Sequence, residues 1–168
     1  MKLIIGMERK LDKAETLSIL KCDWVRLQYQ NILISGASGT GKTWLTCALG
    51  ASVVQHKMSV RCARVGRLAE EIMYARLDGT ITKLRAKLAR LDLLIIDDFA
   101  LSPMSKQELT DIFKIIEDRS AQRSTTLISQ RYPQEWYGYI NDSLLADAFM
   151  DRLRSRAYLL NLEGKSFR

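Results

Sequence analysis

An eight-residue glycine-rich stretch constrains this chain more than any other feature of its sequence. It matches the pattern G-x-x-x-x-G-K-[ST] in full, and its members are Gly36, Ala37, Ser38, Gly39, Thr40, Gly41, Lys42 and Thr43. An apolar run at 32–34, typical of a buried strand, precedes it, and residues 44–49, which are typical of a helix, follow it. Glycines and a helix N-terminus let several N–H groups point at one anion. The stretch therefore predicts a phosphate-binding loop.

The last two loop residues extend the prediction to a nucleoside triphosphate. In this pattern the Lys42 ammonium reaches the β- and γ-phosphates, and the Thr43 hydroxyl ligates Mg²⁺. The alternative is a glycine-rich turn that binds nothing. We favour the binding loop because the strand and helix that the pattern requires are both expected around it.

A second element, a strand that ends in two carboxylates, supports the first. Residues 93–96 are continuously apolar, which is typical of a parallel strand covered on both faces. The run ends at Asp97 and Asp98, and ligands of such sheets bind at the carboxyl ends of the strands. We expect Asp97 to hold Mg²⁺ and its waters, and Asp98 to orient or deprotonate the attacking water. A strand followed by an Asp-capped turn is the alternative.

The positive charge of the chain is concentrated in one stretch. The 168 residues carry a net charge of +7, and residues 57–90 contain nine basic side chains against three acidic ones. A concentrated positive field attracts polyanions, so this stretch is a candidate for contacts with the DNA backbone, a solvated helix face being the alternative. The candidate DNA-binding residues are Arg64, Arg67, Lys83, Arg85 and Lys87.

Composition excludes several other classes of protein. The length suits one domain with a single core, and no apolar run approaches the roughly 18–20 residues of a membrane span. The start of the chain is too short and too quickly charged for a secretory signal. Three widely spaced cysteines, Cys22, Cys47 and Cys62, and a single histidine indicate neither a disulfide framework nor a zinc site. We expect a cytoplasmic protein with buried thiols.

Strands that alternate with helices predict an α/β fold, a parallel sheet flanked by helices, with no separate lid domain. A capping box at Ser105 and Glu108 begins one helix, and Asp12 and Glu15 have similar spacing at the start of another. Aromatic side chains at Trp136, Tyr137 and Tyr139 indicate packing or, alternatively, a partner contact. The expected helices are 12–28, 44–56, 66–77, 81–89, 106–119 and 144–154, and the expected strands are 32–35, 59–64, 91–98, 125–129 and 157–162.

With these motifs in hand, the chain resembles the IstB-like ATPases, helper proteins of a bacterial insertion-sequence transposition system. These are relatives of the DnaC and DnaI helicase loaders within the AAA+ P-loop ATPases. The combination of the loop with Asp-Asp-Phe, a Ser-Gln segment and a late Asp-Arg-Leu is more selective than the loop alone. The matching segments are 21–25, 31–49, 93–101, 116–119, 124–130, 145–152 and 164–166.

The resemblance implies roles for three further residues. Gln130 falls where the family places a polar sensor, which hydrogen-bonds the γ-phosphate or the water. Arg152 falls where an arginine finger is expected, reaching the nucleotide of a neighbouring subunit. Arg154 and Arg156 are the fallback candidates, and a solvated or DNA-facing surface is the alternative for all three. Arg168 resembles a C-terminal basic motif of the loaders.

The resemblance also divides the chain into two parts. Residues 1–30 are expected to be an N-terminal helical segment, the remnant of a longer extension, and residues 31–168 the AAA+ core. Family members usually carry a substantial extension before the core that is involved in DNA or partner binding. We therefore expect either a core-only fragment or a naturally shortened copy.

The leading hypothesis is a Mg²⁺-dependent ATPase that assembles head to tail on duplex DNA and regulates a transposase. ATP would sit between subunits, with Lys42, Thr43 and Asp97 from one and Arg152 from the next. The first alternative is a helicase loader that acts on single-stranded DNA and a replicative helicase. A second is a nucleotide-binding interaction module that has lost hydrolysis. A small-molecule kinase is disfavoured because the sequence shows no arginine-rich lid segment.

Overall fold

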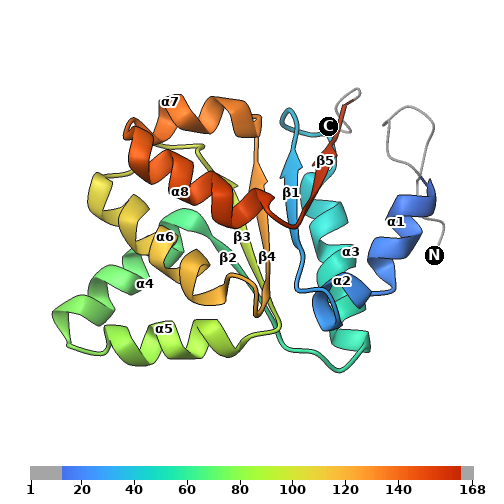
Figure 1. Ribbon diagram of the computed structural model, residues 1–168, viewed down its shortest axis with the longest axis horizontal. Helices are drawn as coiled ribbons and strands as arrows, with labels where there is room; N and C mark the ends of the chain where they lie inside the picture. Colours follow the sequence, from blue (N-terminus) through green and yellow to red (C-terminus); the bar gives the residue numbers. More distant parts are fainter. Residues whose placement is uncertain (1–12, 164–168) are drawn as a thin grey trace.

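The computed structural model describes residues 13–163, which form one sheet with helices on both of its faces (Figure 1). The strands are β1 (Asn31–Ser35), β2 (Val60–Arg64), β3 (Leu93–Phe99), β4 (Ser124–Ser129) and β5 (Ala157–Asn161). The helices are α1 (Lys13–Leu20), α2 (Asp23–Arg26), α3 (Lys42–Gln55), α4 (Val65–Leu77), α5 (Ile81–Arg90), α6 (Lys106–Arg119), η2 (Pro133–Glu135), α7 (Trp136–Ile140) and α8 (Ser143–Arg154).

All five strands run parallel, in the order β2-β3-β4-β1-β5. The prediction of an α/β fold with a parallel sheet is thereby confirmed. Because the strands share one direction, their carboxyl ends meet at a single edge of the sheet. That edge is where the loop after β1 and the residues after β3 and β4 come together.

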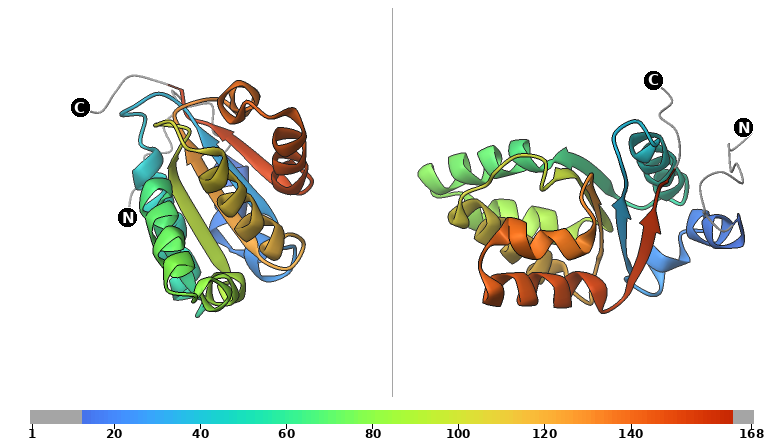
Figure 2. Two further views of the ribbon diagram at one scale, coloured as in Figure 1. Left: turned by 90° about the vertical axis from the view of Figure 1, so that its left-hand side faces the viewer. Right: turned by 90° about the horizontal axis from the view of Figure 1, so that it is seen from above.

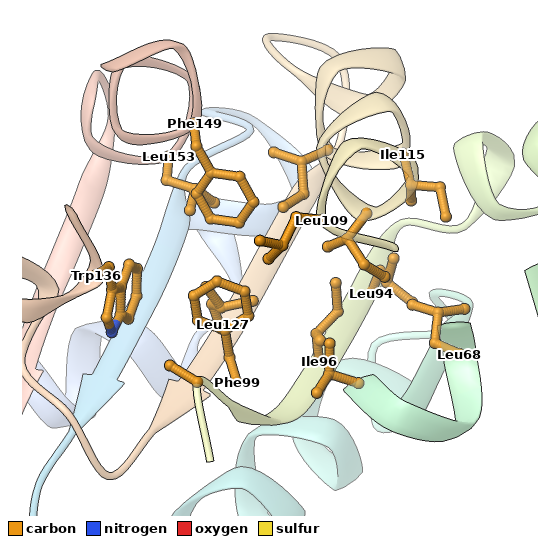
Figure 3. Close-up of a cluster of buried hydrophobic side chains, with 14 of the residues drawn as sticks. Leu68, Leu94, Ile96, Phe99, Leu109, Ile115, Leu127, Trp136, Phe149 and Leu153 are labelled. Atoms are coloured by element: carbon orange, nitrogen blue, oxygen red, sulfur yellow. The ribbon is translucent and has the colours of Figure 1, made fainter. Parts of the chain in front are cut away.

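Buried side chains alternate between the two faces of the central strands. Along β3, Leu94 and Ile96 enter an apolar cluster with α4 to α8, whereas Leu93 and Ile95 enter a second cluster with α1 to α3. Figure 3 shows the first cluster, in which Leu127 of β4 lies among residues of α6 and α8. Burial on both faces explains why these strands read as continuous apolar runs. Figures 1 and 2 agree that α1 lies at the end of the molecule remote from α4.

The expected single helix over 12–28 is wrong. The chain forms two short helices, separated at Cys22, whose backbone is left-handed with a φ of 61°. The indole of Trp24 donates to the Ile19 carbonyl at 2.7 Å and so satisfies a carbonyl at the end of α1. Two leucines within the range 12–28, Leu17 and Leu27, are exposed. The capping residue proposed for this helix, Asp12, lies outside the described residues, as does Arg168.

The predicted capping box is present, and the predicted aromatic cluster is only partly buried. The capping box at the start of α6 is confirmed, with Glu108 N–H donating to Ser105 Oγ at 3.2 Å. Trp136 is fully buried and packs edge-on against Phe99, whereas Tyr137 is exposed. The core interpretation of the aromatic cluster therefore holds for the tryptophan but not for that tyrosine.

Burial of the thiols was predicted too broadly. All three cysteines are free, but only Cys22 is buried; Cys47 and Cys62 are exposed. The prediction is wrong for these two because they occupy solvent-facing positions on α3 and on the edge strand β2. Among the described residues, no helix is both long and apolar enough to cross a bilayer.

A buried arginine fastens the amino-terminal edge of the sheet. Arg119, at the end of α6, is 0% exposed and donates to the carbonyls of Leu88, Leu91 and Ser124 at 2.5, 2.9 and 2.5 Å. Burial lowers the pKa of its guanidinium to about 10. These bonds join the end of α5 and the start of β4 to α6. Arg119 thus pairs with carbonyls in the last turn of α5, just before β3 and at the start of β4.

Replacing this arginine tests its structural role. Arg119→Met should lower the free energy of unfolding by about 3 kcal/mol or more, because three buried carbonyls lose a charged donor. Urea unfolding followed by circular dichroism measures the change. Arg123→Ala is the control at a partly exposed arginine four residues away and should cost less than about 1 kcal/mol. Equal effects of the two substitutions would contradict the role given to Arg119.

Candidate nucleotide-binding site

The glycine-rich loop lies between the carboxyl end of β1 and the first turn of α3, as its sequence context predicted. Three of its glycines have positive φ, 145° at Gly36, 81° at Gly39 and 90° at Gly41. Side chains strain such a backbone, so glycine keeps the loop in this shape. The N–H groups at the start of α3 have no partner within the helix and carry partial positive charge. The loop is therefore shaped to receive an anion.

Gly36 is also required by its neighbour in space. The Leu162 N–H donates to the Ser35 carbonyl at 2.8 Å, which extends the β5–β1 pairing to the loop. A Cβ atom added at Gly36 would lie 2.3 Å from the Leu162 carbonyl oxygen. The end of β5 therefore packs directly on the first residue of the loop.

The Lys42 ammonium lies inside the loop. Its Nζ donates to the carbonyls of Gly36 and Ala37 at 2.6 and 2.7 Å, and only 9% of the residue is exposed. Burial lowers the pKa of Lys42, and the negative charges of Asp97 and Asp98 oppose that shift. A phosphate entering the loop would give this buried cation a counter-charge within reach.

The two carboxylates lie at the carboxyl end of β3, in positions suited to different roles. Burial raises the pKa of Asp97, although its Oδ1 accepts the Asp98 N–H at 2.8 Å. Asp98 has a left-handed backbone with a φ of 61°, where the pairing of β3 with β4 becomes irregular. Its Oδ2 lies 3.5 Å from the Nε of Arg64, at the end of β2. Arg64, predicted to contact DNA, therefore also borders the candidate nucleotide site.

The remaining loop side chains differ in exposure. Ala37, Ser38 and Thr43 are exposed, whereas Thr40 is buried and its Oγ1 donates to the Ala37 carbonyl at 2.8 Å. Thr43 and Asp97 supply the hard oxygen donors that Mg²⁺ prefers. Within residues 13–163, no group of three or more histidines, cysteines or carboxylates could hold a metal ion by itself. Such a donor set fits Mg²⁺ bound jointly by the protein and by phosphate oxygens.

Gln130 lies at the same edge of the sheet. It follows β4 directly and is exposed, and β4 lies between the strand of the carboxylates and the strand of the loop. Its neighbour Arg131 donates from Nε to the Ala100 carbonyl at 3.0 Å. Arg131 was not predicted as a site residue from the sequence. Its position next to Gln130 was the only sequence feature that pointed to it.

Arg152 lies at the opposite edge. It sits in the last turn of α8, where its carbonyl accepts from Nδ2 of Asn31, the first residue of β1. The loop follows the last residue of β1, and a five-residue strand spans about 16 Å at 3.3 Å per residue. The side chain of Arg152 pairs with the adjacent Asp151 at 2.9 Å. The fold therefore separates Arg152 from the loop of its own chain.

The basic stretch is partly neutralised by ion pairs. Arg85 donates to both carboxylate oxygens of Asp118 at 2.8 and 2.7 Å, which raises the pKa of the arginine. Arg61 pairs in the same way with Glu71, and Arg76 with Asp111. The basic side chains of this stretch that are exposed on α4 and α5 include Arg67, Lys83, Lys87 and Arg90.

The parallel sheet, with a phosphate loop after β1 and two carboxylates at the carboxyl end of β3, defines a P-loop nucleotide-binding protein of the AAA+ type. Two solved structures share this fold: DnaI, with a TM-score of 0.77 and 18% identity, and the replication initiator DnaA bound to AMPPCP and single-stranded DNA, with 0.76 and 23%. The likeness covers 92% of this chain and 87% of DnaI, and 97% of this chain and 49% of DnaA.

Sequence relatives identify the family more closely. The family model described as IstB-like ATP binding protein matches residues 6–168, and the chain belongs to this family. The protein y4pL of Sinorhizobium fredii, named as an insertion sequence ATP-binding protein, is 39% identical over 161 residues. That match covers 96% of this chain and 65% of y4pL. An IS21 ATP-binding protein of Pseudomonas aeruginosa is 30% identical over 139 residues, or 83% of this chain and 52% of that protein.

Membership of this family supports ATP as the nucleotide of the site. The chain spans about half to two-thirds of the length of these relatives. What the whole relatives do in transposition therefore enters only as a proposal. The fold and the resemblance to this family are confirmed, whereas the roles of single site residues stay predictions.

A methyl group on the first loop glycine tests the packing of the loop. Gly36→Ala should lower the free energy of unfolding by about 2–4 kcal/mol and weaken binding of a fluorescent ATP analogue at least about tenfold, because it combines a steric clash with a strained φ. Gly66→Ala, on α4, is the matched control, since an added Cβ there meets nothing within 4 Å. Wild-type nucleotide affinity in Gly36→Ala would show that the loop does not depend on this contact.

Proposed function

We propose that this protein is a Mg²⁺-dependent ATPase that assembles head to tail on DNA and regulates a transposase during insertion-sequence transposition. The observation that carries the proposal is the separation of the loop and Arg152 on opposite edges of one sheet. If Arg152 acts on ATP, it acts on the ATP of another subunit. A complete site then requires two copies, and head-to-tail contacts of this kind generate rings or filaments.

Within one subunit, the loop and the carboxylates divide the work. The loop N–H groups and Lys42 bind the phosphates, and Lys42 exchanges its two loop carbonyls for phosphate oxygens. Thr43 and Asp97 would hold Mg²⁺, which neutralises phosphate charge when bound. Asp98 orients or deprotonates the attacking water, and Gln130 hydrogen-bonds the water or the γ-phosphate. The neighbour's Arg152 stabilises negative charge that develops on the γ-phosphoryl group.

DNA is assigned to the exposed basic face of α4 and α5. Lys83 and Lys87 lie one turn apart on α5 and are both exposed. Arg85, which lies between them, forms an ion pair with Asp118, so we expect it to contribute less to DNA binding. Contacts of lysine with phosphates position a protein on DNA without reading sequence, which suits an assembly on varied target sites. The names of the relatives place them in insertion sequences, which supports a transposase as the partner.

Mixing two inactive variants tests the shared site. Lys42→Ala should abolish ATP binding, and Arg152→Ala should bind ATP but hydrolyse it at least about a hundredfold more slowly on DNA. An equal mixture should regain about a quarter of the wild-type rate, because one interface in four then joins an intact loop to an intact arginine. The assay is phosphate release with saturating duplex DNA.

The control for this mixing experiment is Arg26→Ala, an exposed arginine on α2 that should leave the rate unchanged. Absence of recovery in the mixture, with mixed assembly demonstrated by a labelled subunit, would contradict the shared site. Wild-type protein that binds ATP on DNA without turnover would instead favour a binding module that has lost hydrolysis.

Charge reversal on α5 tests the DNA face. The double variant Lys83→Glu/Lys87→Glu should weaken duplex binding and reduce the slope of log affinity against log salt by about 2, roughly one for each phosphate that the variant no longer neutralises. Fluorescence anisotropy with labelled DNA in the presence of an ATP analogue measures both. The control, Lys21→Glu/Arg26→Glu, makes the same charge change beside α1 and α2, on the other face of the sheet. Equal slopes for the two double variants would mean that α5 is a solvated helix face that does not contact DNA.

A further inference from the structure

A single buried asparagine joins three elements at the amino-terminal edge of the sheet. Asn31 is 7% exposed, and its Nδ2 donates to the carbonyls of Arg152 and Leu153 at 3.3 and 3.2 Å. Its Oδ1 accepts the Thr125 N–H at 2.9 Å, and its own N–H donates to the Arg156 carbonyl at 2.8 Å. The side chain therefore ties the end of α8 to the start of both β1 and β4.

The chemistry of these contacts accounts for asparagine at this position. The last carbonyls of a helix have no N–H partner within the helix, and Arg152 and Leu153 belong to the last turn of α8. An amide side chain supplies donors to those carbonyls and, at the same time, an acceptor for a strand N–H. A carboxylate keeps the acceptor and loses the donors. We call these contacts the α8 clamp.

The α8 clamp fixes the segment that carries the late arginines. Arg152 and Arg154 lie in the last turn of α8, and Arg156 lies in the turn to β5. Asn31 hydrogen-bonds only to backbone carbonyls of this segment and to none of its arginine side chains. The clamp therefore sets the position of the helix end, and the helix end sets where the arginine side chains begin. Arg152 is partly exposed and pairs only with its sequence neighbour Asp151 among the ion pairs of the described residues. The position from which this side chain projects thus depends on the clamp.

The same residue begins the strand that ends at the phosphate loop. From Asn31 the chain runs through β1 to Ser35, and Gly36 follows. We infer that Asn31 is a positioning residue for ATP hydrolysis at the site of the neighbouring subunit. It acts by holding the Arg152 end of α8 in a fixed position relative to β1 of its own chain. The inference rests on the proposed function, because it takes Arg152 to act on the ATP of another copy.

Each subunit would supply its loop to one ATP site and its Arg152 to the site of a neighbour, and the test changes only the second contribution. In Asn31→Asp the acceptor for Thr125 remains, but carboxylate oxygens face the carbonyls of Arg152 and Leu153 and repel them. We expect ATP affinity within about threefold of wild type and turnover on DNA reduced at least about tenfold. Hydrogen exchange should accelerate in amides of residues 150–157 and stay unchanged in residues 36–46.

Subunit mixing then distinguishes positioning from general damage. Asn31→Asp mixed with Lys42→Ala should regain about a quarter of the wild-type rate, because the Lys42 variant supplies an intact α8 end to the intact loop of the Asn31 variant. Asn31→Asp mixed with Arg152→Ala should regain nothing, because both lack the same contribution. Asn141→Asp makes the same chemical change at an exposed asparagine and should match wild type when alone. Its equal mixture with Arg152→Ala should show about half of the wild-type rate, because every loop is intact and half of the subunits supply Arg152.

Each outcome decides the inference. Recovery in the Arg152→Ala and Lys42→Ala mixture without recovery in the Asn31→Asp and Lys42→Ala mixture keeps the proposed function and overturns the role of Asn31. Failure of both mixtures overturns the shared site itself. If Asn31→Asp does not fold, Asn31→Ser takes its place, since it removes the clamp without adding charge. If neither variant folds, Asn31 is a folding residue and the inference is wrong.

Discussion

The common direction of the five strands is the constraint on which this molecule depends. It gives the sheet two unlike edges, one made of strand ends and the other of strand beginnings. The phosphate loop, Asp97 and Gln130 meet at the first edge although they lie far apart in the sequence. Arg119 and Asn31 close the second edge by compensating carbonyls that would otherwise be buried and unpaired. Binding chemistry and structural closure are thereby separated in space.

Positive and negative side chains lie close together at the carboxyl ends of the strands and interact electrostatically. Lys42 is buried against loop carbonyls within the influence of two carboxylates, and burial shifts the pKa of Asp97 upward and that of Lys42 downward. Arg64 borders Asp98 from β2. A bound triphosphate with its cation would add charges of both signs to this edge. The arrangement is thus suited to a ligand that is itself highly charged, and less suited to an apolar one.

Local patterns predicted the fold and the loop, because each depends on neighbours in sequence. The loop glycines, the apolar runs and the Ser105 capping box each specify their own backbone. The N-terminal helix was predicted wrongly because tertiary burial of Trp24 and Cys22 outweighed helical periodicity. The ion pair of Arg85 with Asp118 and the clamp at Asn31 escaped prediction because their partners lie 33 and 121 residues away. Exposure at Cys47 and Cys62 was likewise set by which strand and helix face they occupy.

The proposed function requires two copies of the chain to complete one ATP site. The most direct measurement is an electron microscopy reconstruction of the full chain with DNA and a non-hydrolysable ATP analogue. We expect a ring or filament in which Arg152 of one subunit contacts the γ-phosphate held by the loop of the next. A nucleotide bound in a single subunit, with Arg152 turned to solvent or DNA at every interface, would contradict it.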